Sequence, residues 1–376
     1  MSVYLDYNAT AKVRPEAAAA MARALEIGGN PSSVHAAGRG ARAIVEAARA
    51  EVAVLVGAKP PSVVFVSGGT EASALAIESA IAAGYERILV GATEHDAVLE
   101  NARAAGLPYE IWPVDSHGVA DLDWLVDRLD SGPPAQVCLM AANNETGVIQ
   151  PVAAAAALVR AAGGLLHVDA VQAAGKMALD VSELGADTLA LSAHKIGGPQ
   201  GVGALVAGPR ATLARQLHGG GQERGRRAGT ENVPGIAGFG AAATAAIKDL
   251  PAIASQAAWR DDLAAAVTRA GAVVLGEGAP RLAQTLCFAA PGFASELQVM
   301  GLDLAGVMVS AGAACSSGKV KPSWVIEAMG RPDLAPFAIR VSGGWATTAA
   351  DWAGCGAAWA EIFERHQARR RAPALA

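Results

Sequence analysis

The sequence predicts an α/β fold, in which a mostly parallel central sheet is flanked by helices, followed by a smaller α+β domain. Two observations predict the sheet. Short β-branched, apolar runs recur between residues 63 and 191, and longer alanine-rich amphipathic stretches separate them. This alternation is typical of parallel strands joined by crossover helices. The pattern changes after Pro251, which predicts the second domain.

Five short apolar runs predict the strands of a large domain that spans residues 15–250. They are residues 63–66, 87–90, 136–140, 165–168 and 188–191. The stretches between them predict helices at residues 39–56, 71–83, 97–105 and 152–162. Because the carboxyl ends of parallel strands lie at one edge of a sheet, polar residues that follow these strands are expected to meet in one crevice.

Residues 1–14 and 251–376 predict the smaller domain. Its expected elements are a helix at 254–270, strands at 272–275, 285–288 and 339–342, and a closing helix at 349–366. Residues 310–320 lie between the last two strands and are rich in Gly, Ala and Ser, which is typical of a mobile loop. This loop contains Cys315, although most free cysteines are small buried hydrophobes.

Composition and charge exclude several classes of protein. The formal net charge is −5 over 376 residues, so direct nucleic-acid binding is not expected. The cysteines lie far apart, without the spacing of a disulfide framework or an intrinsic metal site; they are Cys138, Cys287, Cys315 and Cys355. The first residues lack the apolar core of a signal peptide, and charges interrupt or bound the apolar stretches. We therefore expect a cytoplasmic protein without a membrane span.

A lysine follows the last predicted parallel strand, in Ser192-Ala-His194-Lys195-Ile-Gly-Gly-Pro-Gln-Gly201. Most lysines in glycine-rich turns are simply exposed. Here the apolar strand ends in the expected crevice, and Ser192 and His194 place polar groups that a plain turn does not need. A lysine whose pKa is lowered in such a crevice is suited to forming a Schiff base.

An aspartate ends the preceding predicted strand, in His167-Val-Asp169-Ala-Val-Gln172. Asp169 can be a helix N-cap, and this stretch alone does not decide against that reading. A buried carboxylate is costly unless it is paired. Beside a Schiff-base lysine, the same carboxylate can keep a pyridinium nitrogen protonated, which makes pyridoxal phosphate an electron sink.

A glycine-rich strand-to-helix turn, Ser67-Gly-Gly-Thr-Glu71, provides an expected anion site. Free amides and the helix dipole favour negative charge at a helix N-terminus. The turn matches neither the dinucleotide fingerprint nor the P-loop. A phosphate monoester with Thr70 as an additional donor fits it better.

Three further polar residues are expected to face the same crevice. His95 begins a predicted helix, where it is either a cap or a group that stacks on an aromatic cofactor and moves protons. Asn144 follows another strand and offers amide donors. Arg340 offers a bidentate fork for a carboxylate, although an arginine on a small-domain strand can equally form a salt bridge.

Taken together, these motifs resemble those of the NifS/IscS-type cysteine desulfurases, pyridoxal-phosphate enzymes of the class V aminotransferase group. The resemblance covers nearly the whole chain, in order: residues 5–7, 29–35, 67–71, 93–95, 143–145, 167–169, 192–195, 218–224, 227–232, the loop around Cys315, and residues 340–342. Each motif is weak alone, whereas the ordered set is highly specific. The resemblance implies the fold of PLP-dependent transferases, fold type I.

The resemblance also implies a role for individual residues. Lys195 would carry pyridoxal 5'-phosphate as a Schiff base, with Asp169 at the ring nitrogen and Gln172 at the phenolic oxygen. His95 would stack on the ring, and both His95 and Lys195 would move protons. The phosphate and the rest of the cofactor would contact Gly69, Thr70, Asn144, Ser192, Ala193 and His194. Asn144 and Arg340 would hold the substrate, L-cysteine.

Two implied roles extend beyond one chain. Thr230 would reach the cofactor phosphate of a neighbouring subunit, so a homodimer is expected. Cys315 would attack the substrate sulfur, leaving alanine and a persulfide for an iron–sulfur scaffold or another sulfur-acceptor protein. Cys315 would share an iron–sulfur cluster with a scaffold only transiently. Its small-residue loop is similar to that of the family group with the longer loop.

The chain departs from the family pattern at several positions. Ala72 and Ala74 replace polar residues, Ala193 and Gly197 replace the usual Gly and aromatic residue, and Gly343-Gly344-Trp345 replaces Leu-Gly-Arg. These changes bear on substrate preference, rate and docking of the small domain. They keep two alternatives open: a selenocysteine lyase or other class V lyase or aminotransferase, and a catalytically poor partner in a sulfur-assembly complex.

Overall fold

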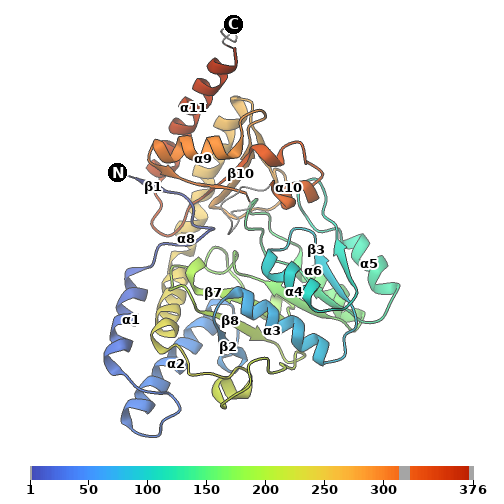
Figure 1. Cartoon of the computed structure of the whole chain (residues 1–376), viewed down its shortest axis with the longest axis vertical. Helices are drawn as coiled ribbons and strands as arrows, with labels where there is room; N and C mark the ends of the chain where they lie inside the picture. Colours follow the sequence, from blue (N-terminus) through green and yellow to red (C-terminus); the bar gives the residue numbers. More distant parts are fainter. Residues whose placement is uncertain (1, 313–321, 372–376) are drawn as a thin grey trace.

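The structure, a computed structural model, describes residues 2–312 and 322–371. Figure 1 shows a larger unit built around one sheet and a smaller unit that carries the C-terminal helix. Helix α8 (Val233–Arg269) extends from the larger unit into the smaller one. Its first turns pack in the core of the large unit through Ile236 and Phe239, and its last turns pack in the other core through Leu263 and Val267.

The central sheet has seven strands in the order β2-β8-β7-β6-β5-β3-β4. Their bounds are β2 (Val63–Val66), β3 (Ile88–Gly91), β4 (Tyr109–Trp112), β5 (Gln136–Cys138), β6 (Leu165–Asp169), β7 (Thr188–Ser192) and β8 (Gly203–Ala207). Strand β8 is antiparallel to both of its neighbours, and the other pairs are parallel. The expected mostly parallel sheet is confirmed, and β4 and β8 are strands that the sequence patterns did not predict.

Both faces of this sheet are covered because successive residues of its strands, which point to opposite faces, are apolar. Val63 and Phe65 face one core cluster, whereas Val64 and Val66 face another. The helices of the large unit are α1 (Pro15–Ile27), α2 (Ala36–Leu55), α3 (Gly69–Ala82), α4 (Asp96–Ala104), α5 (Leu122–Asp130), α6 (Val152–Ala161) and α7 (Val181–Leu184). Helices α3 and α4 cover one face, and α1, α2, α5, α6 and α8 contribute to the core on the other. Strands buried on both faces read as continuous apolar runs, which is why the sequence revealed them.

The smaller unit contains a four-stranded antiparallel sheet in the order β12-β13-β10-β9. Its strands are β9 (Val273–Leu275), β10 (Thr285–Ala289), β12 (Ser310–Ala311) and β13 (Ala338–Ser342). The N-terminal strand β1 (Val3–Tyr4) pairs in parallel with β11 (Val307–Met308). Helices α9 (Ser295–Leu304), α10 (Trp324–Ala328) and α11 (Ala349–Arg371) complete the unit. Short 3-10 turns occur at Pro60–Ser62, Ala193–Lys195, Gln222–Gly225 and Ala335–Phe337.

The expected helix at 254–270 is wrong at its start, because α8 begins at Val233 and continues through Pro251. Proline removes one backbone donor and normally ends or kinks a helix. The side chains on both sides of Pro251 lie in the two cores, and this packing holds the helix together. The change of texture at Pro251 therefore marks the middle of a helix.

The expected loop at 310–320 is also wrong at its start. Ser310 and Ala311 form strand β12 and pair with Arg340 and Ile339 of β13. The rest of the expected loop from residue 313 onward, including Cys315 and its expected mobility, lies outside the described residues. The strand forms because Ala311 is buried and the Ser310 hydroxyl donates a 2.8 Å hydrogen bond to Asp6.

Two other features bear on the class of protein. Within the described ranges, α8 alone has the length and composition of a membrane-crossing helix, but 56% of its most apolar window is buried inside the protein. It is therefore a core helix of this fold. Cys138, Cys287 and Cys355 are buried free thiols, which confirms that they belong to the core.

His167 makes the stability of this fold depend on pH. It is buried on β6, its Nδ1 lies 2.9 Å from Thr188 Oγ1, and its Nε2 lies 3.2 Å from Ser73 Oγ. Burial lowers the pKa of His167 from 6.5 to about 4. The unfolded chain therefore binds this proton more tightly, and the stabilisation present above pH 6.5 is lost as the pH falls toward 4. We expect a loss of about 3 kcal/mol from this group.

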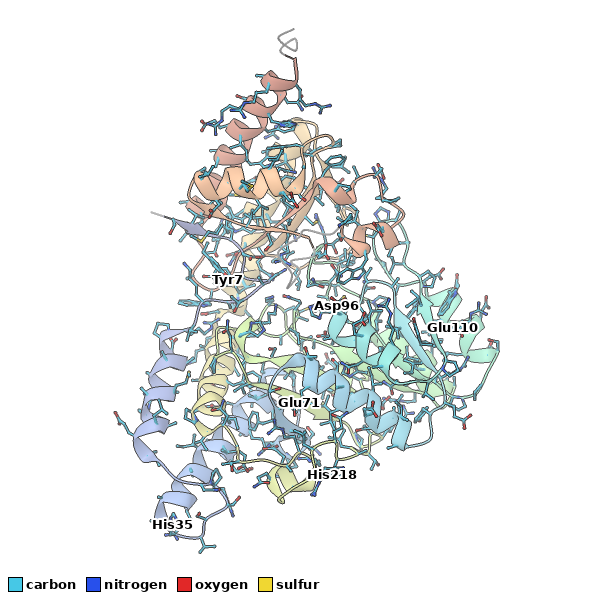
Figure 2. All side chains as sticks on the ribbon, viewed as in Figure 1. Tyr7, His35, Glu71, Asp96, Glu110 and His218 are labelled. Atoms are coloured by element: carbon cyan, nitrogen blue, oxygen red, sulfur yellow. The ribbon has the colours of Figure 1, made fainter. Side chains whose placement is uncertain are left out.

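The test compares the pH dependence of the free energy of unfolding between wild type and a His167→Gln variant. The variant should lose about 3 kcal/mol less between pH 6.5 and pH 4, whatever its absolute stability. His218 is exposed, and its His218→Gln variant is the control that should keep the wild-type slope (Figure 2). Equal slopes in wild type and His167→Gln would contradict the assignment.

Candidate active site

A cavity of about 350 Å³ lies at the carboxyl ends of β3, β5, β6 and β7, where the two units meet. Figure 2 places Tyr7 and Asp96 at this junction. Ten of the predicted site residues line the cavity: Gly69, Thr70, His95, Asn144, Asp169, Gln172, Ser192, His194, Lys195 and Arg340. The crevice expected from strand order therefore exists and brings together residues that are up to 271 positions apart.

Lys195 ends a short 3-10 turn that directly follows β7. Its Nζ donates hydrogen bonds to two backbone carbonyls, 2.6 Å to Asn8 O and 2.8 Å to Ala9 O. Burial and, to a smaller extent, Arg340 lower the pKa of Lys195 to about 8, whereas Asp169 and Asp6 oppose the shift. A substantial fraction of this amine is therefore neutral, and nucleophilic, near pH 8.

Asp169 is the last residue of β6 and is buried beside the cavity. Its Oδ1 accepts a 2.9 Å hydrogen bond from the backbone N–H of Val171, but the residues that follow form a turn and not a helix, so the helix N-cap reading is wrong. Burial raises the pKa of Asp169, while the Val171 hydrogen bond, His95 and Lys195 oppose that rise. The carboxylate therefore orders the turn that follows β6 and lines the cavity.

His95 is the N-cap of α4, where its Nδ1 accepts a 3.0 Å hydrogen bond from Ala97 N. The ring also lines the cavity. Because Nδ1 serves as an acceptor, the proton of the neutral ring is on Nε2. His95 is therefore a cap whose second nitrogen remains available for proton transfer.

The glycine-rich turn and the lysine turn form a second, adjoining cavity of about 440 Å³. The two cavities share Gly69, Thr70, Ser192 and His194. Helix α3 begins at Gly69, so its free N–H groups and the positive end of its dipole lie at this end of the site. The turn approaches β8 so closely that a Cβ on Gly203 would lie 2.6 Å from the Cα of Gly68. Glycine is therefore required there.

His194 is a neutral group at this end of the site. Its Nδ1 lies 3.1 Å from Thr10 Oγ1. Burial, and to a smaller extent the neighbouring amines of Lys195 and Lys176, lower the pKa of His194 to about 4. A neutral imidazole can accept from Thr10 and donate through Nε2, which suits binding of an anion without adding a formal charge.

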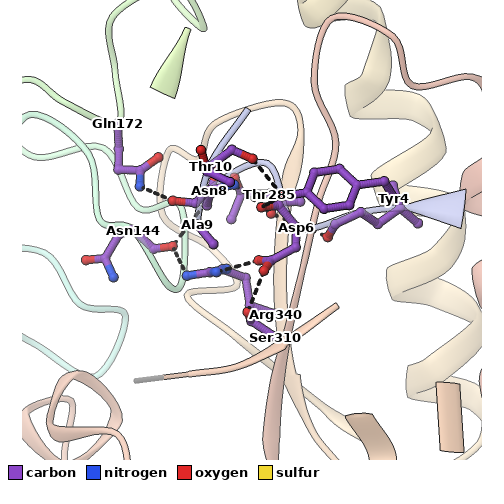
Figure 3. Close-up of polar contacts among 12 residues, drawn as sticks. Tyr4, Asp6, Asn8, Ala9, Thr10, Asn144, Gln172, Thr285, Ser310 and Arg340 are labelled. Carbon is purple, nitrogen blue, oxygen red and sulfur yellow. Dashed lines mark hydrogen bonds and ion pairs between the residues drawn. The ribbon is translucent and has the colours of Figure 1, made fainter. Parts of the chain in front are cut away.

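Arg340 on β13 forms the salt bridge that the sequence left as one of two alternatives. Its Nη2 donates to Asp6 Oδ1 at 2.7 Å, and its Nη1 donates to Asn144 O at 3.1 Å (Figure 3). Asp6 Oδ2 in turn accepts from Ser310 Oγ at 2.8 Å. The Nε of Arg340 is buried and has no partner among the described residues. Arg340 is therefore fixed by Asp6 and still has one donor to offer at the cavity.

Asn8 is a site residue that sequence reasoning missed. Its backbone carbonyl accepts from Lys195 and, at 2.9 Å, from Gln172 Nε2. Its side-chain Nδ2 donates to Asn144 O and Thr285 Oγ1, at 3.1 and 3.0 Å. The only sequence signal for Asn8 was that it lies two residues after Asp6, in a segment without helical or strand periodicity. Its partners become neighbours only when the two units pack.

Glu145 and Trp324 also line the cavity and were not assigned from the sequence. Glu145 is fully buried, and its Oε2 accepts a 2.6 Å hydrogen bond from Ser323 Oγ. Within residues 2–312 and 322–371, neither Glu145 Oε1 nor Trp324 Nε1 has a hydrogen-bond partner. Burial raises the pKa of Glu145, while Ser323 and Arg340 oppose that rise.

Two predicted site residues lie away from the main cavity. Ala193 is buried in the core of the large unit, where its N–H donates to Val202 O at 3.0 Å. Ala193 therefore stabilises the turn that carries Lys195 through core packing and a backbone hydrogen bond, and it does not line either cavity. Thr230 is exposed and lines a separate cavity of about 220 Å³. Cys315 lies outside the described residues.

The segment around Thr230 is held in place by two ion pairs. Arg49 makes a buried, bidentate pair with Glu223, at 2.7 and 2.9 Å. Glu223 and Arg224 have positive φ angles of 47° and 57°, a left-handed conformation that costs energy for such side chains. Arg227 pairs with Glu71 of α3 at 2.8 Å. These contacts fix a strained surface segment next to the turn that begins α3.

Departures from the family pattern have structural roles here. Ala72 is fully buried in the apolar cluster over α3, so packing replaces a polar group. Gly197 has φ +89°, and a Cβ there would lie 2.6 Å from Cγ of Arg14. The guanidinium of Arg14 lies 5.3 Å from the ring centroid of Trp345, whose Nε1 donates to Lys12 O at 2.8 Å. Trp345 therefore docks the smaller unit on the N-terminal segment.

The fold and the site together define a class of protein. The family model named aminotransferase class-V matches residues 3–352, and the chain belongs to this family. It is 45% identical over 361 residues to a cysteine desulfurase of Cereibacter sphaeroides, covering 93% of this chain and 92% of that protein.

Two further proteins show which members of the family this chain resembles. The chain is 38% identical to the cysteine desulfurase IscS of Dictyoglomus turgidum, over 93% of this chain and 91% of that protein. A solved NifS-like protein of Rickettsia africae ESF-5 matches with a TM-score of 0.89 at 28% identity, covering 97% of this chain and all of that one. The resemblance to NifS/IscS-type cysteine desulfurases and the expected fold are confirmed.

The charges around Lys195 predict how its pKa responds to substitution. Asp169→Asn removes an anion that raises the pKa of Lys195, so this variant should lower it. Arg340→Gln removes a cation that lowers the pKa of Lys195, so this variant should raise it. We expect each shift to be on the order of one unit.

The measurement is the pH dependence of the rate at which Lys195 reacts with an amine-specific reagent in the cofactor-free protein. A peptide map assigns the reaction to Lys195. Lys248 is exposed, and Lys248→Met is the control that should leave the rate profile unchanged. Shifts of the same sign in Asp169→Asn and Arg340→Gln would contradict the electrostatic account.

Proposed function

We propose that this protein is a pyridoxal-phosphate-dependent cysteine desulfurase that converts L-cysteine to L-alanine and leaves a persulfide on Cys315. One observation carries the proposal: a half-buried lysine with a lowered pKa shares a cavity with a buried carboxylate, and the cavity opens onto a helix N-terminus. Membership of the class V family and likeness to named cysteine desulfurases support the same reading.

The residues present fit the proposed cofactor. Asp169 is a buried carboxylate whose pKa is raised by burial, and a protonated pyridine nitrogen would supply it with a cationic partner. The α3 N-terminus, Thr70, Ser192 and neutral His194 form a donor set for a phosphate. Lys195 offers an amine that is partly neutral near pH 8. When bound, pyridoxal phosphate supplies an electron sink for bond cleavage next to the substrate amino group.

This chain's own side chains would then perform distinct tasks. Lys195 would attach the cofactor and, once released by the substrate, carry a proton to or from the substrate carbons. Asp169 would keep the ring nitrogen protonated, and Gln172 would donate to the phenolic oxygen through its Nε2. His95 would stack on the ring and exchange a proton at Nε2, since its Nδ1 is occupied by Ala97.

Cys315 would be the nucleophile. Its thiolate would attack the substrate sulfur, so that an S–S bond forms and the Cβ–S bond breaks. The electron pair of the broken bond stays with the organic product, which takes up a proton at Cβ to give alanine. Chain geometry supports the assignment: Gly312 lines the cavity, and three peptide units span at most about 11 Å.

Arg340 and Asn144 would hold the substrate amino acid, Arg340 through the substrate carboxylate. Arg340 lines the cavity and is held by Asp6, and its buried Nε has no partner among the described residues. The position of Arg340 is therefore set before the substrate arrives, which reduces the ordering cost of binding.

The proposal extends to partners and compartment. Thr230 is exposed and lies next to a separate cavity, which suits a contact with the cofactor phosphate of a second copy in a homodimer. The persulfide sulfur would pass to an iron–sulfur scaffold or another acceptor protein. The expected setting is the cytoplasm.

A selenocysteine lyase is the second candidate. It keeps the fold and the cofactor but changes the chemistry, and the departures from the family pattern at Ala72, Ala74 and Gly343–Trp345 leave the substrate preference open. Cleavage of the weaker C–Se bond does not require a nucleophilic thiol. A Cys315→Ala variant that releases selenide from selenocysteine, in an enzyme inactive on cysteine, would favour this candidate.

Substitution of Cys315 tests the proposed reaction. Cys315→Ala should retain the visible absorbance of bound pyridoxal phosphate but lose alanine formation from L-cysteine by on the order of a thousandfold or more, because the nucleophile is gone. The control is Cys355→Ala, which removes a buried thiol of the small unit and should retain persulfide formation. Normal turnover by Cys315→Ala would rule out the mechanism.

Substitution of Arg340 tests substrate binding. Arg340→Lys keeps the positive charge but loses the planar fork, so we expect KM for L-cysteine to rise by about 10- to 100-fold. Steady-state kinetics at fixed pH measure the change, with the cofactor absorbance confirming that the site is intact. An unchanged KM would show that Arg340 serves only the salt bridge with Asp6.

A further inference from the structure

A second buried lysine lies beside Lys195, and the proposed mechanism does not use it. Lys176 is 8% exposed and follows Gln172 by one turn of the chain. Its Nζ donates to the side-chain oxygen Gln172 Oε1 and, at 3.1 Å, to Asn8 Oδ1. Lys195 contacts the same asparagine through the backbone carbonyl. Two buried amines therefore bind one residue from two sides.

The surroundings of Lys176 favour a neutral amine. Among the described residues, no carboxylate forms an ion pair with its Nζ. Burial lowers the pKa of Lys176 strongly, and the nearby positive charges of Lys195 and Arg340 lower it further. A neutral amine has two donors, and both are accounted for by Gln172 and Asn8.

These contacts determine how the Gln172 carboxamide is oriented. A carboxamide has a donating end and an accepting end. Lys176 binds the accepting end, Oε1, and the donating end, Nε2, points to the carbonyl of Asn8 (Figure 3 shows Gln172 and Asn8). The second N–H of Gln172 is thereby left for the cavity, which Gln172 lines.

We propose that Lys176 is a positioning residue that fixes the Gln172 amide with its N–H₂ end toward the cofactor site. The inference rests on the proposed function, in which Gln172 donates to the phenolic oxygen of pyridoxal phosphate. Without Lys176, Oε1 would be a buried acceptor without a donor, which costs about 1–3 kcal/mol and drives the amide to other orientations. The donor at the cofactor would then be lost.

Lys176 also acts on the substrate side through Asn8. Its hydrogen bond to Asn8 Oδ1 leaves Nδ2 free to donate to Asn144 O and Thr285 Oγ1. The carbonyl of Asn144 also accepts from Arg340. One buried amine therefore orients two amides, one beside the cofactor site and one beside the proposed substrate residues.

The experiment uses the full-length holoenzyme with three variants, Lys176→Met, Gln172→Met and the double variant. The readout is the midpoint of the pH titration of the bound cofactor's visible absorbance. A donor to the phenolic oxygen favours the deprotonated form of the linkage, so loss of that donor raises the midpoint. We expect Lys176→Met to raise it by about half to one pH unit.

The double variant separates positioning from general destabilisation. If Lys176 acts through Gln172, Lys176→Met should add no further shift in the Gln172→Met background. Lys248→Met, at an exposed position, is the matched control and should titrate like wild type. An unchanged midpoint in Lys176→Met, or a full second shift in the double variant, would overturn the proposal.

A cofactor-free measurement separates this proposal from the proposed function. In the apoprotein, the side-chain N–H₂ of Gln172 should exchange with solvent more slowly in wild type than in Lys176→Met, as followed by NMR with labelled glutamine. Equal exchange rates would also overturn the role of Lys176. A wild-type protein that binds no pyridoxal phosphate would instead contradict the proposed function and leave the exchange measurement to decide the role of Lys176.

Discussion

The site depends on one backbone carbonyl, that of Asn8, which accepts hydrogen bonds from Lys195 and Gln172. The segment that carries it follows β1, which pairs with β11 of the smaller unit, and the N–H of Asn8 donates to Ser342 Oγ on β13. The lysine itself lies at the end of a strand of the large unit. The amine is therefore oriented only when the two units are docked, so the geometry of the reactive group is a consequence of packing between units.

The charge state of the buried carboxyl groups in the crevice depends on which of them have hydrogen-bond or ionic partners. Burial raises the pKa of Glu94 well above its usual range, and Asp169 raises it further. Glu94 Oε1 accepts from the Met140 N–H, while Oε2 has no partner within the described ranges. Two adjacent carboxylates rarely both ionise in a buried site. A neutral Glu94 leaves the negative charge of this pair on Asp169, and the hydrogen bond of Glu94 to Met140 joins the segments that follow β3 and β5.

Sequence patterns revealed those site residues whose position follows from the strand directly before them. Lys195, Asp169 and His95 each follow an apolar strand, and chain topology alone brings the ends of parallel strands together. Asn8, Glu145 and the pairing of Arg340 with Asp6 escaped prediction, because contacts between residues as far as 334 positions apart depend on how two cores pack. The start of α8 escaped prediction for the same reason, because packing against both cores keeps the chain helical through Pro251.

The atoms that remain unpaired indicate the ligand that this cavity is built to take. Within the described residues, Arg340 Nε is a buried donor without an acceptor, and Asn144 Oδ1 is a buried acceptor without a donor. Each such atom costs about 1–3 kcal/mol until a ligand pairs with it. Under the proposed function, the substrate is an α-amino acid, whose carboxylate is an acceptor and whose amino group is a donor, so it carries a partner for each atom. A simple carboxylic acid or amine carries only one of the two partners, and the proposed function therefore predicts that both bind more weakly than the amino acid.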